Sequence, residues 1–175
     1  MKILVVYKSK TGFTKKYAQW IARDLSADIH EYASVDKKML GKYDIIIYGG
    51  SLYAVGINGK KLITQNLDIL KNKKVIVFAV GASPYREEII NEIRDNNFSK
   101  EEQKTIQFYY LRGGFHYHRL PLFDKILMNL LQLKLKWKKV LTPDEKGMLS
   151  AFKMPVDFTR KQNIQEIINH VHSLL

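Results

Sequence analysis

The residues best suited to chemistry lie near the N-terminus, in the segment from Ser9 to Thr14. Three of its side chains are hydroxyls, those of Ser9, Thr11 and Thr14, and each can donate a hydrogen bond to an anion. Gly12 lets the backbone approach a ligand closely. An apolar run precedes the segment and an amphipathic one follows it, so free N–H groups at a helix start would face the same anion. The pattern indicates a phosphate monoester held by neutral donors.

An ordinary helix start would use similar residues, because Ser, Thr and Gly are favoured there without any ligand. The spacing does exclude two other nucleotide-binding motifs, the Walker loop G-x-x-x-x-G-K-[ST] and the dinucleotide loop G-x-G-x-x-G. The position of the segment in the fold therefore decides between a capped helix and a phosphate site.

Two later segments, 49–56 and 81–85, each combine glycine, a small hydroxyl residue and a tyrosine. Such segments offer close backbone approach, N–H and C=O groups, and aromatic faces to a flat ring system. A purely structural reading is that the tyrosines cover the open edge of a sheet. The candidate contacts for a ring are Ser51, Leu52, Tyr53, Ala54, Gly56, Gly81, Ala82, Ser83 and Tyr85.

The elements that must position these segments alternate along the chain. Apolar runs predict strands at 3–7, 28–32, 44–48, 74–80 and 105–111, and the third is expected to end at Gly49-Gly50. Amphipathic patterns predict helices at 14–26, 60–70, 87–96 and 160–174. This alternation predicts one α/β domain over 1–175, a doubly wound parallel sheet in the order 2-1-3-4-5. Its ligand crevice lies at the carboxyl ends of strands one and three, where Ser9 to Thr14 is found.

One connection is longer than the others. Residues 112–157 separate the fifth strand from the last helix and include a helical run at 122–131 with lysines after it. The run suits either a core-facing helix or a helix that rests on an anionic bilayer.

The composition limits the partners. Lys and Arg total 29 against 17 Asp and Glu, a formal charge of +12, which favours anionic partners. Nucleic acid is not expected, because no RNP, zinc-finger or helix-turn-helix signature is present. The chain has no cysteine, which excludes disulfides and thiolate ligands, and no metal site is expected.

No apolar run is long enough for a signal peptide or a membrane span, so we expect a cytoplasmic protein, with peripheral contact to the inner face of the membrane.

Ser9-x-Thr11-Gly12-x-Thr14 after an N-terminal strand resembles the phosphate loop of the flavodoxin family. The resemblance implies the cofactor flavin mononucleotide (FMN), with its phosphate held without a metal by Ser9, Lys10, Thr11, Gly12, Phe13 and Thr14. It also implies that the two later segments hold the flavin ring, with Tyr53 and Tyr85 as candidates to flank it.

The insertion carries a narrower resemblance. Leu111-Arg112-Gly113-Gly114 followed by aromatic residues, a Phe123-Asp124-Lys125 helix and Val156-Asp157-Phe158 resembles the menaquinone-dependent protoporphyrinogen oxidase branch of flavodoxin-like proteins. That branch implies oxidation of protoporphyrinogen IX, in heme biosynthesis, with electrons passed to a quinone. Arg112 and Arg119 are then candidates to bind the substrate propionates, and His116, Tyr117 and His118 are candidates for proton handling.

Rival functions follow from the same residues. A flavodoxin-type electron carrier without a small substrate is the main alternative, although a charge of +12 is unlike the acidic carriers of that family. An FMN-dependent quinone reductase with a nicotinamide donor is a further alternative, for which the sequence shows no donor-binding motif.

Overall fold

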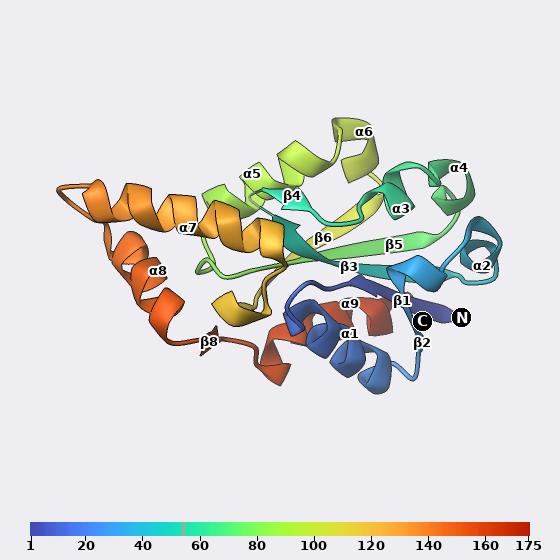
Figure 1. The fold of residues 1–175 in the computed structure, drawn as a ribbon. Coiled ribbons are helices and arrows are strands. Elements are labelled where there is room, and N and C mark those ends of the chain that lie inside the picture. Colours follow the sequence, from blue (N-terminus) through green and yellow to red (C-terminus); the bar gives the residue numbers. More distant parts are fainter. Residues whose placement is uncertain (54) are drawn as a thin grey trace.

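A parallel sheet forms the centre of the molecule in the computed structural model, which describes residues 1–53 and 55–175 (Figure 1). Its strand order is β2-β1-β3-β5-β6. This confirms the predicted order 2-1-3-4-5, because the extra strand β4 pairs only with β3. The bounds are β1 (Ile3–Lys8), β2 (Asp28–Glu31), β3 (Ile45–Tyr53), β5 (Lys74–Gly81) and β6 (Ile106–Arg112).

Helices cover both faces of the sheet because its central strands are apolar on both sides. On one face, α1 (Phe13–Asp24) and α9 (Gln165–Leu174) pack through residues such as Tyr17 and Ile167. On the other, α5 (Glu87–Asn97) packs through Ile93. Tyr48 and Phe78, on adjacent strands, are fully buried on opposite sides of the sheet.

Several predicted helices differ from the structure. The helix predicted over 60–70 is two short ones, α3 (Lys61–Thr64) and α4 (Leu67–Leu70), because the Asn66 side chain donates to the carbonyl of Leu62 and ends the first. The last predicted helix begins with the 3-10 turn η3 (Lys161–Ile164) before α9. The remaining short elements are η1 (Tyr32–Ser34), α2 (Lys37–Gly41), α6 (Lys100–Gln103) and η2 (Tyr117–Arg119).

The third strand is longer than predicted. It does not end at Gly49-Gly50 but continues to Tyr53, because β5 pairs with it as far as Ser51 and the residues at 56–57 pair with Leu52 and Tyr53. The chain then turns back as β4 (Gly56–Ile57), antiparallel to β3. Ala54, one of the expected flavin contacts, lies outside the described residues.

The insertion is a helical hairpin on a narrow base. Its base is the antiparallel pair β7 (Gly114–Phe115) and β8 (Val156–Asp157), and α7 (Leu122–Trp137) and α8 (Pro143–Lys153) project from it beyond the sheet (Figure 1). The helix predicted at 122–131 is thus longer, and α8 was not predicted. Its signal was a Thr142/Glu145 capping box with Pro143 at the first helical position.

Candidate functional site

The segment between β1 and α1 has the geometry of an anion site. The Ser9 hydroxyl accepts a hydrogen bond from the Gly12 N–H at 3.1 Å. Gly12 has a φ of +98°, a conformation that other residues resist, and α1 begins directly after it. No side chain of the described residues caps this helix, and the first N–H with a backbone partner at the helix start is that of Lys16, on the Gly12 carbonyl. The N–H groups of the first turn are left for a ligand.

Lys10 joins this segment to two others. Its amino group contacts a carboxylate oxygen of Asp124, at the start of α7, at 2.7 Å. The same nitrogen lies 4.3 Å from the ring centre of Tyr53, at the end of β3. The Asp124 side chain is 8% exposed and that of Lys10 29%, so the ion pair is largely removed from water. The structure therefore brings the expected phosphate segment, one expected ring segment and the insertion together at one edge of the sheet.

The last part of β3 contains a buried donor that has no partner among the described residues. The Ser51 hydroxyl has no hydrogen-bond partner among the described residues. Buried polar atoms are almost always paired, so this hydroxyl points to a polar ligand. Asn97 of α5 fixes the backbone that follows β3. Its amide donates to the Val55 carbonyl at 2.6 Å and accepts from the Ile57 N–H at 2.9 Å.

The segment after β5 is fixed by the neighbouring strand β6. The Tyr110 hydroxyl donates to the Ser83 carbonyl at 2.7 Å, and burial raises the pKa of Tyr110 to about 12, which keeps the proton on the donor. Arg112 donates to the Ala82 carbonyl at 3.3 Å. Gly81, Ala82 and Ser83 are therefore held by side chains and backbone of β6 and the residues after it.

The two candidate tyrosines lie in different surroundings. Tyr53 is 41% exposed and faces Lys10, close to the phosphate segment. Tyr85 is 73% exposed and lines a groove of about 620 Å³ along β6, together with Arg112 and Phe158. Tyr53 thus contacts Lys10 of the phosphate segment.

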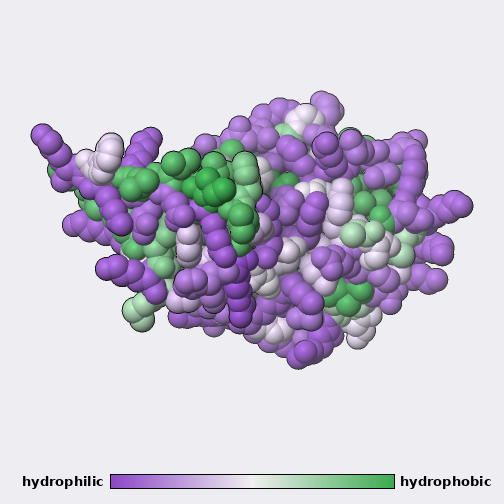
Figure 2. All heavy atoms as spheres, in the orientation of Figure 1, coloured by the Kyte–Doolittle hydropathy of each residue, from purple (hydrophilic) through white to green (hydrophobic). Residues whose placement is uncertain are grey.

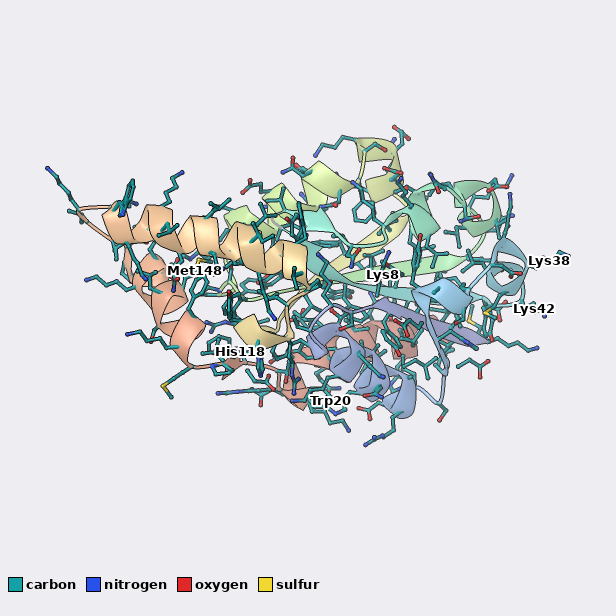
Figure 3. The ribbon with its side chains drawn as sticks, in the orientation of Figure 1. Lys8, Trp20, Lys38, Lys42, His118 and Met148 are labelled. Atoms are coloured by element: carbon teal, nitrogen blue, oxygen red, sulfur yellow. The ribbon has the colours of Figure 1, made fainter. Side chains whose placement is uncertain are left out.

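The start of the insertion lies over the phosphate segment. A guanidinium nitrogen of Arg119 is 3.8 Å from the position that a Cβ on Gly12 would take. The described residues offer Arg119 no ion-pair partner, which leaves its charge available to an anion at Gly12. Figure 3 draws His118 on the same turn, between α7 and α1.

The other candidates in the insertion differ in how they are held. The Tyr117 hydroxyl donates to Asn129 of α7 at 2.8 Å, and its ring packs on Phe152 of α8. Tyr117 therefore connects the two helices of the insertion. His116 has a buried ring nitrogen, Nδ1, without a partner among the described residues. Its ring centre lies 6.3 Å from that of His118. The two histidines are adjacent, and His116 is the one with an unsatisfied buried nitrogen.

The base of the insertion is tied to α1 behind the phosphate segment. Lys16 contacts Asp157 at 3.0 Å, and the Tyr17 hydroxyl donates to the Arg112 carbonyl at 2.6 Å while accepting from Asn163. Burial opposes ionisation of Asp157, but hydrogen bonds from Thr159 and Lys16 outweigh it and lower the pKa of that carboxyl. The insertion and the phosphate segment are therefore one connected unit.

Arg112 and Arg119 do not meet at one point. The Arg112 guanidinium lies 3.7 Å above the ring centre of Phe158, on the groove beside β6, whereas Arg119 lies beside Gly12. Three residues that organise the site had no predicted role there, namely Asn97, Tyr110 and Asp124, although Asp124 belongs to the Phe123-Asp124-Lys125 motif. A buried asparagine has no local signal, because its partners are distant in sequence.

Within the described residues, no group of three or more His, Asp or Glu side chains is arranged to hold a metal ion. The helices described there include none that is long and apolar enough to cross a membrane.

Comparison of the sequence with known proteins identifies the family of this chain. Residues 4–140 match the model of the flavodoxin domain. An uncharacterised protein of Methanocaldococcus jannaschii is 35% identical over 106 residues, which are 57% of this chain and 68% of that protein.

Similar solved structures are more distant. The Trp repressor binding protein from Bacillus subtilis is 17% identical, with a TM-score of 0.48 over 64% of this chain and 86% of that one. Two-electron reduced Megasphaera elsdenii flavodoxin is 17% identical, with a TM-score of 0.46 over 63% and 85%. A flavoprotein in complex with FMN from Lactobacillus acidophilus is 17% identical, with a TM-score of 0.45 over 63% and 92%.

The family match covers the central sheet except for Ile3, and it includes the segments 49–56 and 81–85. The neutral donors at the start of α1 and the unpaired Ser51 hydroxyl suit the phosphate and the polar edge of a flavin. The chain belongs to the flavodoxin domain family, and its cofactor is FMN.

Proposed function

We propose that this chain is an FMN-dependent oxidoreductase that oxidises protoporphyrinogen IX and uses a quinone as the electron acceptor. The observation that carries the proposal is the insertion fastened across the phosphate segment by the Lys10–Asp124 ion pair. An electron carrier needs an accessible edge of the flavin ring and does not need a further protein segment, such as this insertion, beside the ring. An enzyme needs such a segment to hold and orient a substrate against the ring.

The proposed cofactor contacts follow the three segments. Ser9, Lys10, Thr11, Gly12, Phe13 and Thr14 hold the phosphate end. The ring end takes Ser51, Leu52, Tyr53, Gly56, Gly81, Ala82, Ser83 and Tyr85. When bound, FMN supplies the capacity to accept electrons from one partner and deliver them to another, and the protein supplies position and electrostatics.

The substrate contacts in this proposal lie around the insertion. Arg112 is half-buried beside Tyr85, where it can bind a propionate while its stacking on Phe158 fixes the guanidinium. Conversion of the porphyrinogen to the porphyrin removes six hydrogen atoms, and three quinone molecules accept them as three quinols, so electrons and protons balance. His116, with its unpaired buried nitrogen, and His118 are the proposed groups for moving the protons.

The test is porphyrin formation under anaerobic conditions. FMN-loaded protein is mixed with protoporphyrinogen IX and a soluble naphthoquinone. The protoporphyrin fluorescence should then rise much faster than in a control that contains free FMN instead of the protein. Asp124→Asn should slow the rate per bound FMN by about tenfold, because Lys10 loses the partner that holds α7 in place. Asp68→Asn breaks a similar ion pair with Lys37 on the surface and should leave the rate unchanged. No fluorescence with quinone present contradicts the proposal.

The second candidate is an electron carrier, favoured by the exposure of Tyr53 and Tyr85 at the edge where the ring would lie. It predicts rapid, reversible reduction by a flavodoxin reductase and no turnover of protoporphyrinogen. The two functions are separated by measuring both reactions on the same preparation.

The position of Arg119 changes the role that we propose for it. Because its guanidinium lies beside Gly12, it suits the FMN phosphate better than a substrate carboxylate. Arg119→Gln should weaken FMN binding by about tenfold and leave riboflavin, which has no phosphate, unaffected. Quenching of flavin fluorescence measures both affinities. An equal loss for both flavins would place Arg119 away from the phosphate.

A further inference from the structure

The helix α7 carries a continuous apolar face that is exposed. Its residues recur at steps of three or four, so they lie on one side of the helix. Figure 2 shows this apolar surface along α7. The face consists of Leu122, Phe123, Ile126, Leu127, Leu130, Leu133 and Trp137, with exposed fractions from 37% to 86%.

This face is not the one by which α7 packs on the rest of the molecule. The packing side carries Asp124 and Leu135, both buried, with Met128 and Leu131 half-buried between them. The helix therefore has one apolar side that supports the fold and a second that meets solvent. Contiguous apolar surface of this kind marks an interaction site in a soluble protein.

The charges beside the exposed face identify the partner. Lys125 and Lys136 border it on one side and Lys134 on the other, by their positions on the helix. Lys139 lies just beyond its end, whereas Lys138 before it is paired with Glu145 of α8. The one acidic residue of α7, Asp124, is paired with Lys10 on the packing side. A second copy of the chain would bring like charges together, whereas an anionic lipid surface complements both the apolar face and its lysines.

We propose that the outer face of α7 docks this protein on an anionic lipid membrane, with the helix lying in the plane of the interface. Trp137 and the lysines around it lie at the depth of the headgroups, and the leucines and Phe123 enter the acyl boundary. The α7–α8 hairpin projects from the sheet, so its outer face can meet a flat surface (Figure 1). This docking is independent of which substrate the site oxidises.

Vesicle binding by the full FMN-loaded chain tests the proposal. The chain should sediment with vesicles of phosphatidylglycerol and phosphatidylcholine at least about tenfold more strongly than with phosphatidylcholine alone, and less at high salt. In a Trp20→Phe background, the Trp137 emission should shift to the blue on binding, because this side chain is 86% exposed in solution.

Variants with fewer apolar side chains distinguish binding through the α7 face from non-specific hydrophobic binding to vesicles. Phe123→Ser, Leu130→Ser and Trp137→Ser together should lower binding by about tenfold or more, with the fold intact because all three side chains are exposed. Ile29→Ser with Met154→Ser removes exposed apolar side chains elsewhere and should bind as the wild type does.

Charge variants test the role of the lysines. Lys134→Glu with Lys136→Glu should abolish the preference for anionic vesicles, because both residues border the apolar face. The matched control is Lys38→Glu with Lys42→Glu, two exposed lysines at the opposite end of the molecule (Figure 3), which should keep it.

Three results would overturn the proposal. They are no sedimentation above background with anionic vesicles, an equal loss in the control variants, and a stable dimer that the triple α7 variant converts to monomer. Vesicle binding without porphyrin formation would contradict the proposed enzyme activity and leave the membrane docking supported.

Discussion

Gly12→Val should lower the affinity for FMN by about a hundredfold, because the loop before α1 needs a backbone conformation that valine does not adopt. Gly12 has a φ of +98°, and a β-branched residue there costs about 3 kcal/mol or forces the loop to rearrange. Either outcome misplaces the Ser9 hydroxyl and the N–H groups of the first turn of α1. Titration of flavin fluorescence measures the change.

Riboflavin is the internal control for this variant. It lacks the phosphate, so its affinity should change by less than about threefold. Gly41→Val is the matched protein control, because a Cβ at Gly41 would meet no atom within 4 Å and its φ is not positive. If Gly12→Val lowered both affinities equally, the phosphate would not lie at this loop.

The architecture could be predicted from the sequence because it depends on local patterns. Runs such as Ile45 to Tyr48 are apolar at every position, which suits strands buried on both faces, and they alternate with amphipathic helices. The strand order then follows from the rules for doubly wound sheets.

Element ends were harder to predict, since they depend on neighbours in space. Glycines at positions 49 and 50 suggested a strand end, but β3 pairs with β5 as far as Ser51 and then with β4 as far as Tyr53. In the same way, the helical run was predicted over 122–131, whereas α7 continues to Trp137. Lysines after Leu133 obscured the periodicity.

The contacts that assemble the site are almost all long-range. Lys10 meets Asp124 across more than a hundred residues, and Asn97 fixes the segment after β3 from a helix that follows the next strand. A sequence shows which residue types are present but not which buried amide will meet which carbonyl. That is why an anion site could be predicted at Ser9 to Thr14 from local residue types, whereas the roles proposed for Arg112 and Arg119 depend on their positions in the fold.

The insertion should lose its attachment in Gly114→Val. A Cβ at Gly114 would collide with the carbonyl oxygen of Val156 and would lie 2.7 Å from Cζ of Phe13. The first collision breaks the pairing of β7 with β8, and the second displaces a residue of the phosphate loop. Overpacking of this kind costs about 3 kcal/mol. We expect a lower melting temperature and weaker FMN binding in the same variant.

Two measurements separate these effects. Hydrogen exchange should increase across α7 and α8 while the central strands stay protected, because the collision lies at the base of the hairpin and not within the sheet. Gly147→Val, where an added Cβ has no neighbour within 4 Å, should change neither exchange nor FMN affinity. Normal FMN affinity with a detached hairpin would show that the phosphate loop folds without the insertion. In that case FMN binding would need neither the packing of Phe13 on the base of the insertion nor the Lys10–Asp124 pair, because Asp124 lies on the detached hairpin.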